Sequence, residues 1–256
     1  MFDRAFLKQL SRQRLQSGRG NAILAAFLTA LLGGGAAGTG GLSLNWNFSD
    51  SDGERIFGGA VPSWETIGGI LLGILGIAAI LGLLYSIFVS NVIEVGCRGW
   101  FLRYWRGENL SSGELFASFR IYKPAVVTAL LRDLYVFLWS LLLIIPGIIK
   151  SYAYSMASYI IYENPNMDAS EALQLSERLT NGAKGDLFVL DLSFIGWNLL
   201  SACTFGILGL VYVNPYTYTT HAAVYQSLKA SAIQSGRLSW ADFGQMPPAA
   251  PEAPAE

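Results

Sequence analysis

The stretch IGGILLGILGIAAILGLLYSIFVS, residues 67–90, decides the fold, because it contains no charged side chain. A helix needs about 20 apolar residues to cross the roughly 30 Å hydrocarbon core of a membrane. Inside that core every backbone amide must find its hydrogen-bond partner within the segment, which favours a helix over irregular chain. Residues 67–90 therefore predict a transmembrane helix.

The composition of the whole chain agrees with this prediction. Of the 256 residues, 52% are hydrophobic and only 14% are charged, whereas about 25% of the residues in a soluble domain are charged. The net charge is -1, so the chain lacks the basic excess that binding to nucleic-acid phosphates requires. We expect an all-α, polytopic membrane protein without a separate soluble catalytic domain and without a nucleic-acid partner.

Further apolar segments predict an integral membrane domain over residues 21–229 with about six transmembrane helices. Pro146-Gly147 favours a turn between the third and fourth spans, and Thr204-Phe-Gly206 favours a turn between the fifth and sixth. Without this last turn the span count would be five. The expected spans are residues 22–37, 67–90, 125–145, 148–162, 187–204 and 207–228.

The remaining segments are more polar. Residues 1–20 are basic and amphipathic, which is typical of a segment on the inner leaflet, and residues 38–66 form an acidic, glycine-rich outer loop. Asp168 is placed to cap an interfacial amphipathic helix over approximately residues 168–182. Residues 230–256 form a cytoplasmic tail, which is expected to be disordered from about 246 because Pro, Ala and Glu dominate it.

The distribution of basic residues predicts the orientation of the chain. With these spans, 14 of the 17 Lys and Arg residues lie in segments on the side of the N-terminus. Basic segments remain in the cytoplasm. We therefore expect a multi-pass protein of the cytoplasmic membrane with both termini in the cytoplasm.

Charged residues inside predicted spans are candidates for function, because each costs a few kcal/mol at mid-membrane unless it is paired or faces water. Arg132, Asp133, Asp191 and His221 all fall about 6 to 12 Å inside the cytoplasmic boundary at 1.5 Å per residue. One hypothesis is a polar cluster that binds a headgroup, an ion or a peptide group. The alternative is that Arg132 extends to the interface while the carboxylates only hold helices together. Glu94 is a further polar candidate.

The sequence predicts neither a metal site nor a cofactor. His221 is the only histidine, and Cys97 and Cys203 are the only cysteines, so a typical set of zinc ligands is missing. No catalytic motif is present, which favours a protein that is not an enzyme. Paired carboxylates around a water molecule would be the remaining route to catalysis.

Small residues on residues 67–90 predict a helix contact. Gly69 and Gly73 have the spacing that lets two helices approach closely, either within one chain or between chains. Besides membrane lipids, a second copy or another membrane protein on this face is therefore an expected partner.

Several motifs between Leu130 and Leu228 carry a family resemblance: Ile145-Pro-Gly-Ile-Ile-Lys-Ser-Tyr-Ala-Tyr-Ser-Met156, Asn164-Pro165, Glu171-Ala-Leu173 with Ser176, Leu187-Phe-Val-Leu-Asp-Leu-Ser-Phe-Ile-Gly-Trp197 and Val213-Asn-Pro-Tyr216. With these motifs the chain resembles the bacterial integral membrane family called domain of unknown function 975. This resemblance implies a multi-span protein of the bacterial cytoplasmic membrane and carries over no activity. The chain is also distantly similar to the membrane module attached to some glycerophosphodiester phosphodiesterases, which implies a lipid-associated accessory role.

Three functions are compatible with these features. The first is a non-enzymatic accessory or binding module that recognises lipid or peptide in the membrane. The second is a small transporter or channel whose polar path is lined by Arg132, Asp133 and Asp191. The third is a membrane-embedded enzyme that acts on a lipid.

Overall fold

The computed structural model describes residues 3–17, 23–25 and 64–247. Within these residues the chain is helical and contains no strand. The predicted outer loop, residues 38–66, lies outside the described residues except at its end. The same holds for most of the predicted first span, residues 22–37, so its prediction stays open.

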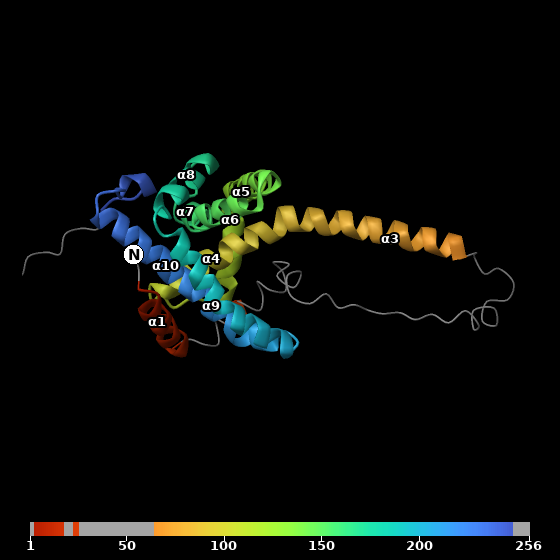
Figure 1. The fold of residues 1–256 in the computed structure, drawn as a ribbon, viewed down its shortest axis with the longest axis horizontal. Coiled ribbons are helices and arrows are strands. Elements are labelled where there is room, and N and C mark those ends of the chain that lie inside the picture. The colour runs from red at the N-terminus through yellow and green to blue at the C-terminus, as the bar shows by residue number, and fades with distance from the viewer. Residues whose placement is uncertain (1–2, 18–22, 26–63, 248–256) are drawn as a thin grey trace, which may run out of the picture.

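Residues 67–90 belong to one long helix that continues well beyond them. It consists of α3 (Trp64–Tyr85), the π-helical turn η3 (Ser86–Ser90) and α4 (Asn91–Trp105). Figure 1 shows α3 extending away from the remaining helices, whereas α4 lies among them. The large apolar side chains of α3 from residue 71 onward are exposed, as expected of a helix whose solvent is lipid.

The third predicted span forms a helical hairpin with the chain that follows it. The 3-10 helix η4 (Ser112–Ile121) begins with a capping box, in which the side chains of Ser111 and Glu114 bind each other's backbone amides. It leads into α5 (Tyr122–Leu142), which packs against α6 (Ile144–Ala153).

The turn of this hairpin is not where the sequence placed it. The helix breaks at Leu143, whose φ of −158° and ψ of 138° are extended, and Pro146 lies inside the first turn of α6. A proline is tolerated there because first-turn amides have no partner within the helix. Gly147 serves close packing instead, since a Cβ on it would lie 2.1 Å from Ser140 Oγ.

The fourth predicted span, residues 148–162, is not a single helix. It comprises most of α6 and, after a turn, α7 (Ala157–Glu163). The 10 residues of α6 extend over about 15 Å, which is half the thickness of the hydrocarbon core.

The predicted amphipathic helix corresponds to α8 (Ala169–Leu179), and Asp168 accepts a hydrogen bond from the Ser170 amide at 2.9 Å as its N-cap. Its apolar residues Ala172, Leu175 and Leu179 are buried within the protein core. Contacts with α5 and α7 cover this helix, so protein rather than lipid supplies much of its apolar environment.

The last apolar block forms two helices with a turn between them, as the sequence predicted. α9 (Lys184–Cys203) ends before Phe205 and Gly206, which have φ values of 51° and 82°. The chain then returns through the π-helical turn η5 (Gly209–Val213) into α10 (Asn214–Gln234) and ends its described part after η6 (Ala241–Phe243). Leu238 and Phe243 are buried, so the beginning of the predicted tail packs on the body.

The N-terminal basic segment forms α1 (Arg4–Ser17), which packs against α10. Lys8 donates a hydrogen bond to Ser193 on α9 and lies 4.4 Å from the centre of the Phe194 ring. Arg12 lies over the ring of Tyr216 at 5.2 Å. The basic face of α1 therefore contacts aromatic residues of the body.

Three helices in the described residues are long and apolar enough to cross a membrane: Leu71–Trp105, Gly113–Leu142 and Lys184–Cys203. Exposed apolar side chains are concentrated on α3, on the end of α5 with the start of α6, and on the second half of α9. The core lies elsewhere, mainly among α4, α7, α8 and α10. The structure thus combines a packed helical body with helices whose apolar surfaces are exposed.

Candidate functional site

A groove of about 500 Å³ opens between α4, α5 and α6, where the exposed apolar surface meets the packed body. Two of the predicted site residues, Arg132 and Asp133, line it. The residues of this groove that bear on function are Glu94, Arg98, Arg132, Asp133, Phe137 and Ser140.

Four charged side chains form one network along the groove. Arg98 Nη2 lies 2.6 Å from Glu94 Oε1, and Arg132 Nη1 approaches the same oxygen at 3.4 Å. Arg132 Nε binds Asp133 Oδ1 at 2.9 Å. Two guanidinium groups and two carboxylates balance each other, so the network is neutral overall.

The helices explain why these side chains meet. Glu94 and Arg98 are one helical turn apart on α4, the spacing at which side chains are neighbours. Arg98 is fixed further because its Nη1 donates to the carbonyl oxygen of Ser155 at 2.7 Å. Arg132 reaches Glu94 from α5, and its side chain is 16% exposed, compared with 52% for Asp133. The groove therefore presents a carboxylate at its rim and guanidinium groups deeper inside.

The other two predicted site residues form a second pair. His221 Nε2 on α10 lies 2.9 Å from Asp191 Oδ1 on α9, and Asp191 also interacts with Tyr152 on α6. The structure thus pairs Arg132 with Asp133 and His221 with Asp191. Arg98 of the groove network also interacts electrostatically with Asp191, so the transport path suggested through Arg132, Asp133 and Asp191 stays a prediction.

Two residues of the network were not among the predicted site residues. Glu94 was named only as a further polar candidate, and Arg98 stands among the basic residues that follow the second span. The signal that could have found them is the spacing of Glu94 and Arg98, which places opposite charges on one helix face. The sequence does not show that α5 brings Arg132 to the same face.

The groove has the chemistry of a binding site more than that of a catalytic site. Ser140 and Ser151 donate their hydroxyl protons to the backbone carbonyl oxygens of Val136 and Ile148, at 2.7 and 2.8 Å. A serine nucleophile would instead need a neighbouring base. Across the part of the chain that the structure describes, no three His, Cys, Asp or Glu side chains gather as a metal site would require.

Guanidinium groups bind phosphate oxygens through paired hydrogen bonds, and a carboxylate binds an ammonium group. The groove offers both within one network. Phe137, which also lines the groove, is 64% exposed and extends the site onto apolar surface. The arrangement can therefore hold a molecule that has a phosphate, an ammonium group and an apolar portion.

These features define an all-helical protein in which three of the described helices are long and apolar enough to cross a membrane. A groove lined by charged side chains lies where the exposed apolar surface meets the packed body. Residues 141–232 match the family described as Protein of unknown function (DUF975). This match confirms the family resemblance seen in the C-terminal half of the sequence. Neither the curated proteins nor the solved structures contain a match to the chain.

Proposed function

We propose that this protein is a non-enzymatic binding module of the bacterial cytoplasmic membrane that holds the headgroup of a zwitterionic phospholipid. In this proposal it crosses the membrane several times, with both termini in the cytoplasm. The main support for this proposal is the neutral network of four charged side chains, Glu94, Arg98, Arg132 and Asp133. This network lines a groove that opens beside exposed apolar surface.

The charge pattern favours an ethanolamine headgroup. The lipid phosphate binds Arg132 and Arg98, and the primary ammonium group donates hydrogen bonds to Asp133 at the rim. An anionic headgroup would find no excess positive charge in the network. A choline headgroup carries a cation without N–H donors, so it cannot hydrogen-bond to Asp133. The acyl chains lie along Phe137 and the exposed end of α5.

Binding of short-chain phosphatidylethanolamine, phosphatidylcholine and phosphatidylglycerol to the full chain in detergent tests the proposal, with native mass spectrometry as the readout. We expect phosphatidylethanolamine to bind most tightly. Asp133→Asn removes the preference over phosphatidylcholine and retains binding, whereas Arg132→Gln weakens binding of both lipids.

Arg120→Gln is the matched control, because Arg120 is an exposed arginine outside the groove. Equal affinity of the unmodified protein for all three lipids would refute the headgroup assignment. So would an Asp133→Asn protein with an unchanged preference.

A further inference from the structure

A second cavity, of about 430 Å³, lies where the ends of α4 and α10 meet the C-terminal segment around η6. Figure 1 places this end of α10 on the opposite side of the body from α3. The cavity is therefore remote from the most exposed apolar helix. Its occupant is expected to come from the aqueous phase and not from the bilayer.

A buried ion pair forms the floor beside this cavity. Lys229 Nζ lies 2.5 Å from Glu163 Oε2, and both side chains are only 4% exposed. The Tyr225 hydroxyl donates to the same carboxylate oxygen at 2.7 Å, and Arg106 binds the other oxygen. Glu163 is the one carboxylate that pairs with both Lys229 and Arg106, so these three side chains together carry one net positive charge.

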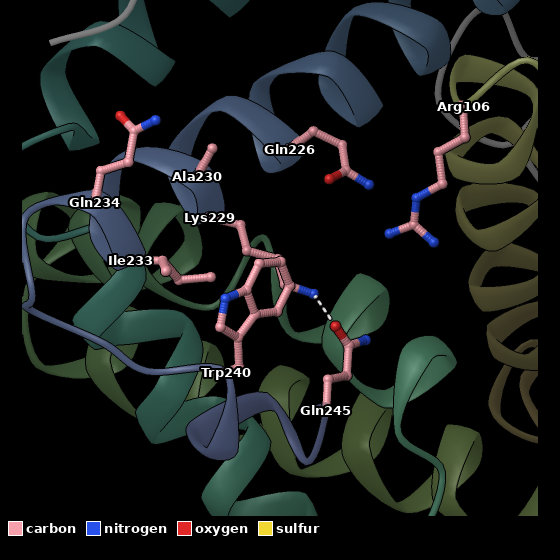
Figure 2. A pocket seen from close by; sticks show the side chains of 8 residues that line it. All are labelled: Arg106, Gln226, Lys229, Ala230, Ile233, Gln234, Trp240 and Gln245. Carbon is pink, nitrogen blue, oxygen red and sulfur yellow. Dashed lines mark hydrogen bonds between the residues drawn. The ribbon is translucent and has the colours of Figure 1, made fainter. Parts of the chain in front are cut away.

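Several hydrogen-bond acceptors around the cavity are already engaged, although Gln234 at its edge is exposed. Both carboxylate oxygens of Glu163 accept bonds, and the side-chain oxygen of Gln245 accepts from Lys229 at 2.9 Å. With its amide oxygen facing Arg106, Gln226 accepts from the guanidinium group at 2.6 and 2.7 Å. Figure 2 shows Arg106, Gln226 and Gln245 around the same space. What remains for a ligand is mainly N–H donors, which suit an anion with several oxygen atoms.

One wall of the cavity is apolar and aromatic. Trp240 and Ile233 line it, and Trp240 is only partly buried. Lys229 lies 5.7 Å from the centre of the indole ring and 4.5 Å from that of Phe243. These contacts hold the indole beside the cationic floor. A planar group stacked on an aromatic ring gains binding free energy without needing specific hydrogen bonds.

The size of the cavity also exceeds the needs of a lone phosphate, since pockets of roughly 300 to 1,000 Å³ suit whole small molecules. We propose that this cavity binds a nucleoside monophosphate, or a phosphorylated aromatic molecule of the same kind. Its phosphate faces Arg106, Gln226 and Gln245, and its ring stacks on Trp240. This second site is independent of the proposed lipid site.

Isothermal titration calorimetry of the full chain in nanodiscs tests the proposal, with adenosine monophosphate, adenosine and inorganic phosphate as the probes. We expect adenosine monophosphate to bind at least about tenfold more tightly than either part, because stacking and anion binding add. Trp240→Leu reduces affinity for the nucleotide at least about fivefold and leaves phosphate affinity unchanged. Gln226→Glu, which places a carboxylate beside the phosphate, weakens binding of both.

Arg120→Gln again serves as the control and retains full nucleotide affinity. Thermal unfolding of each variant separates loss of the site from loss of the fold, and Gln226 is only partly buried, so its replacement tests the site if Trp240→Leu unfolds. Failure of adenosine monophosphate to bind the folded protein overturns the proposal. Equal binding of phosphate and nucleotide overturns it too, as does an unchanged nucleotide affinity in folded Gln226→Glu.

Discussion

Lys229 and Glu163 are the most deeply buried ion pair among the described residues, with 4% of each side chain exposed. Removing two charges from water costs several kcal/mol, so such a pair persists only when its geometry and additional hydrogen bonds compensate. Here Tyr225, Arg106 and Gln245 supply the additional contacts. Replacing only one of the two residues therefore lowers the free energy of unfolding by more than the intact pair adds to it, because the other charge stays buried without its partner.

Replacing Lys229 with methionine leaves the Glu163 carboxylate buried with only part of its compensation. We expect Lys229→Met to lower the free energy of unfolding by about 3 kcal/mol, measured by thermal unfolding in detergent. Arg178→Gln is the matched control, because Arg178 is 58% exposed and its 3.5 Å pair with Asp242 is worth less than about 1 kcal/mol. Similar losses in both variants would contradict this account.

The same pair predicts a pH dependence. Burial alone would raise the pKa of Glu163, but the charge of Lys229 and the hydrogen bonds from Lys229 and Tyr225 hold it below its ordinary value of 4.5. Since the pKa is lower in the folded state, ionised Glu163 stabilises the fold above the ordinary pKa. This contribution is lost as the pH falls through the folded pKa.

The stability difference between the unmodified protein and Glu163→Gln is therefore expected to be largest near neutral pH and to shrink as the pH falls below 4.5. Thermal unfolding in detergent from pH 7 to pH 3 measures it. A difference that stays constant over this range would show that the carboxylate charge does not stabilise the fold.

At the scale of the helices, the sequence predicted helix ends correctly where neighbouring residues determine them. Asp168 caps α8 as expected, and the turn at Phe205 and Gly206 separates α9 from the following helix. The break before α6 was predicted a few residues too late. Pro146 looks like a breaker in sequence, yet a first-turn position suits it, and tertiary packing of Gly147 on Ser140 fixes the hairpin.

That close approach makes Gly147 sensitive to substitution. A Cβ at this position would lie 2.1 Å from Ser140 Oγ and 2.8 Å from Ser140 Cα, so the two helices must separate. We expect Gly147→Ala to destabilise the protein by about 1 to 3 kcal/mol, measured by thermal unfolding in detergent. Gly196→Ala on α9 has no atom near its new Cβ and should be neutral or slightly stabilising. Equal stability of the two variants would contradict the packing role of Gly147.

The candidate groove was predictable in part. Depth along the chain selected Arg132 and Asp133, which line it, and also Asp191 and His221, which form an ion pair and do not line it. Depth cannot give the rotation of one helix relative to another. The contact of Arg132 with Glu94 and the buried pair of Lys229 with Glu163 both join distant parts of the chain. Such contacts depend on packing, which single-helix patterns do not encode.

At the scale of the whole molecule, the question is which helices cross the membrane. α9 has 20 residues and is apolar enough to cross, and Phe205 at the following turn is 98% exposed. Because we propose that both termini lie in the cytoplasm, we expect this turn on the outer side and η6 on the inner side.

Cysteine labelling in cells tests this arrangement. In a Cys203→Ala background, where the remaining Cys97 is buried, an impermeant maleimide should label Phe205→Cys in intact cells. It should label Ala241→Cys only after lysis, because Ala241 lies in η6. Labelling of both positions in intact cells, or of neither, would contradict the arrangement.

The long helix formed by α3, η3 and α4 joins distant parts of the protein. At 1.5 Å per residue, Trp64–Trp105 extends over about 60 Å, roughly twice the thickness of the hydrocarbon core. A membrane that becomes thinner or thicker changes the tilt of such a helix. Arg98 on α4 lines the groove, and Arg106 directly after α4 lines the second cavity. A change in membrane thickness is therefore expected to act on a helix that contributes a residue to each of the two cavities.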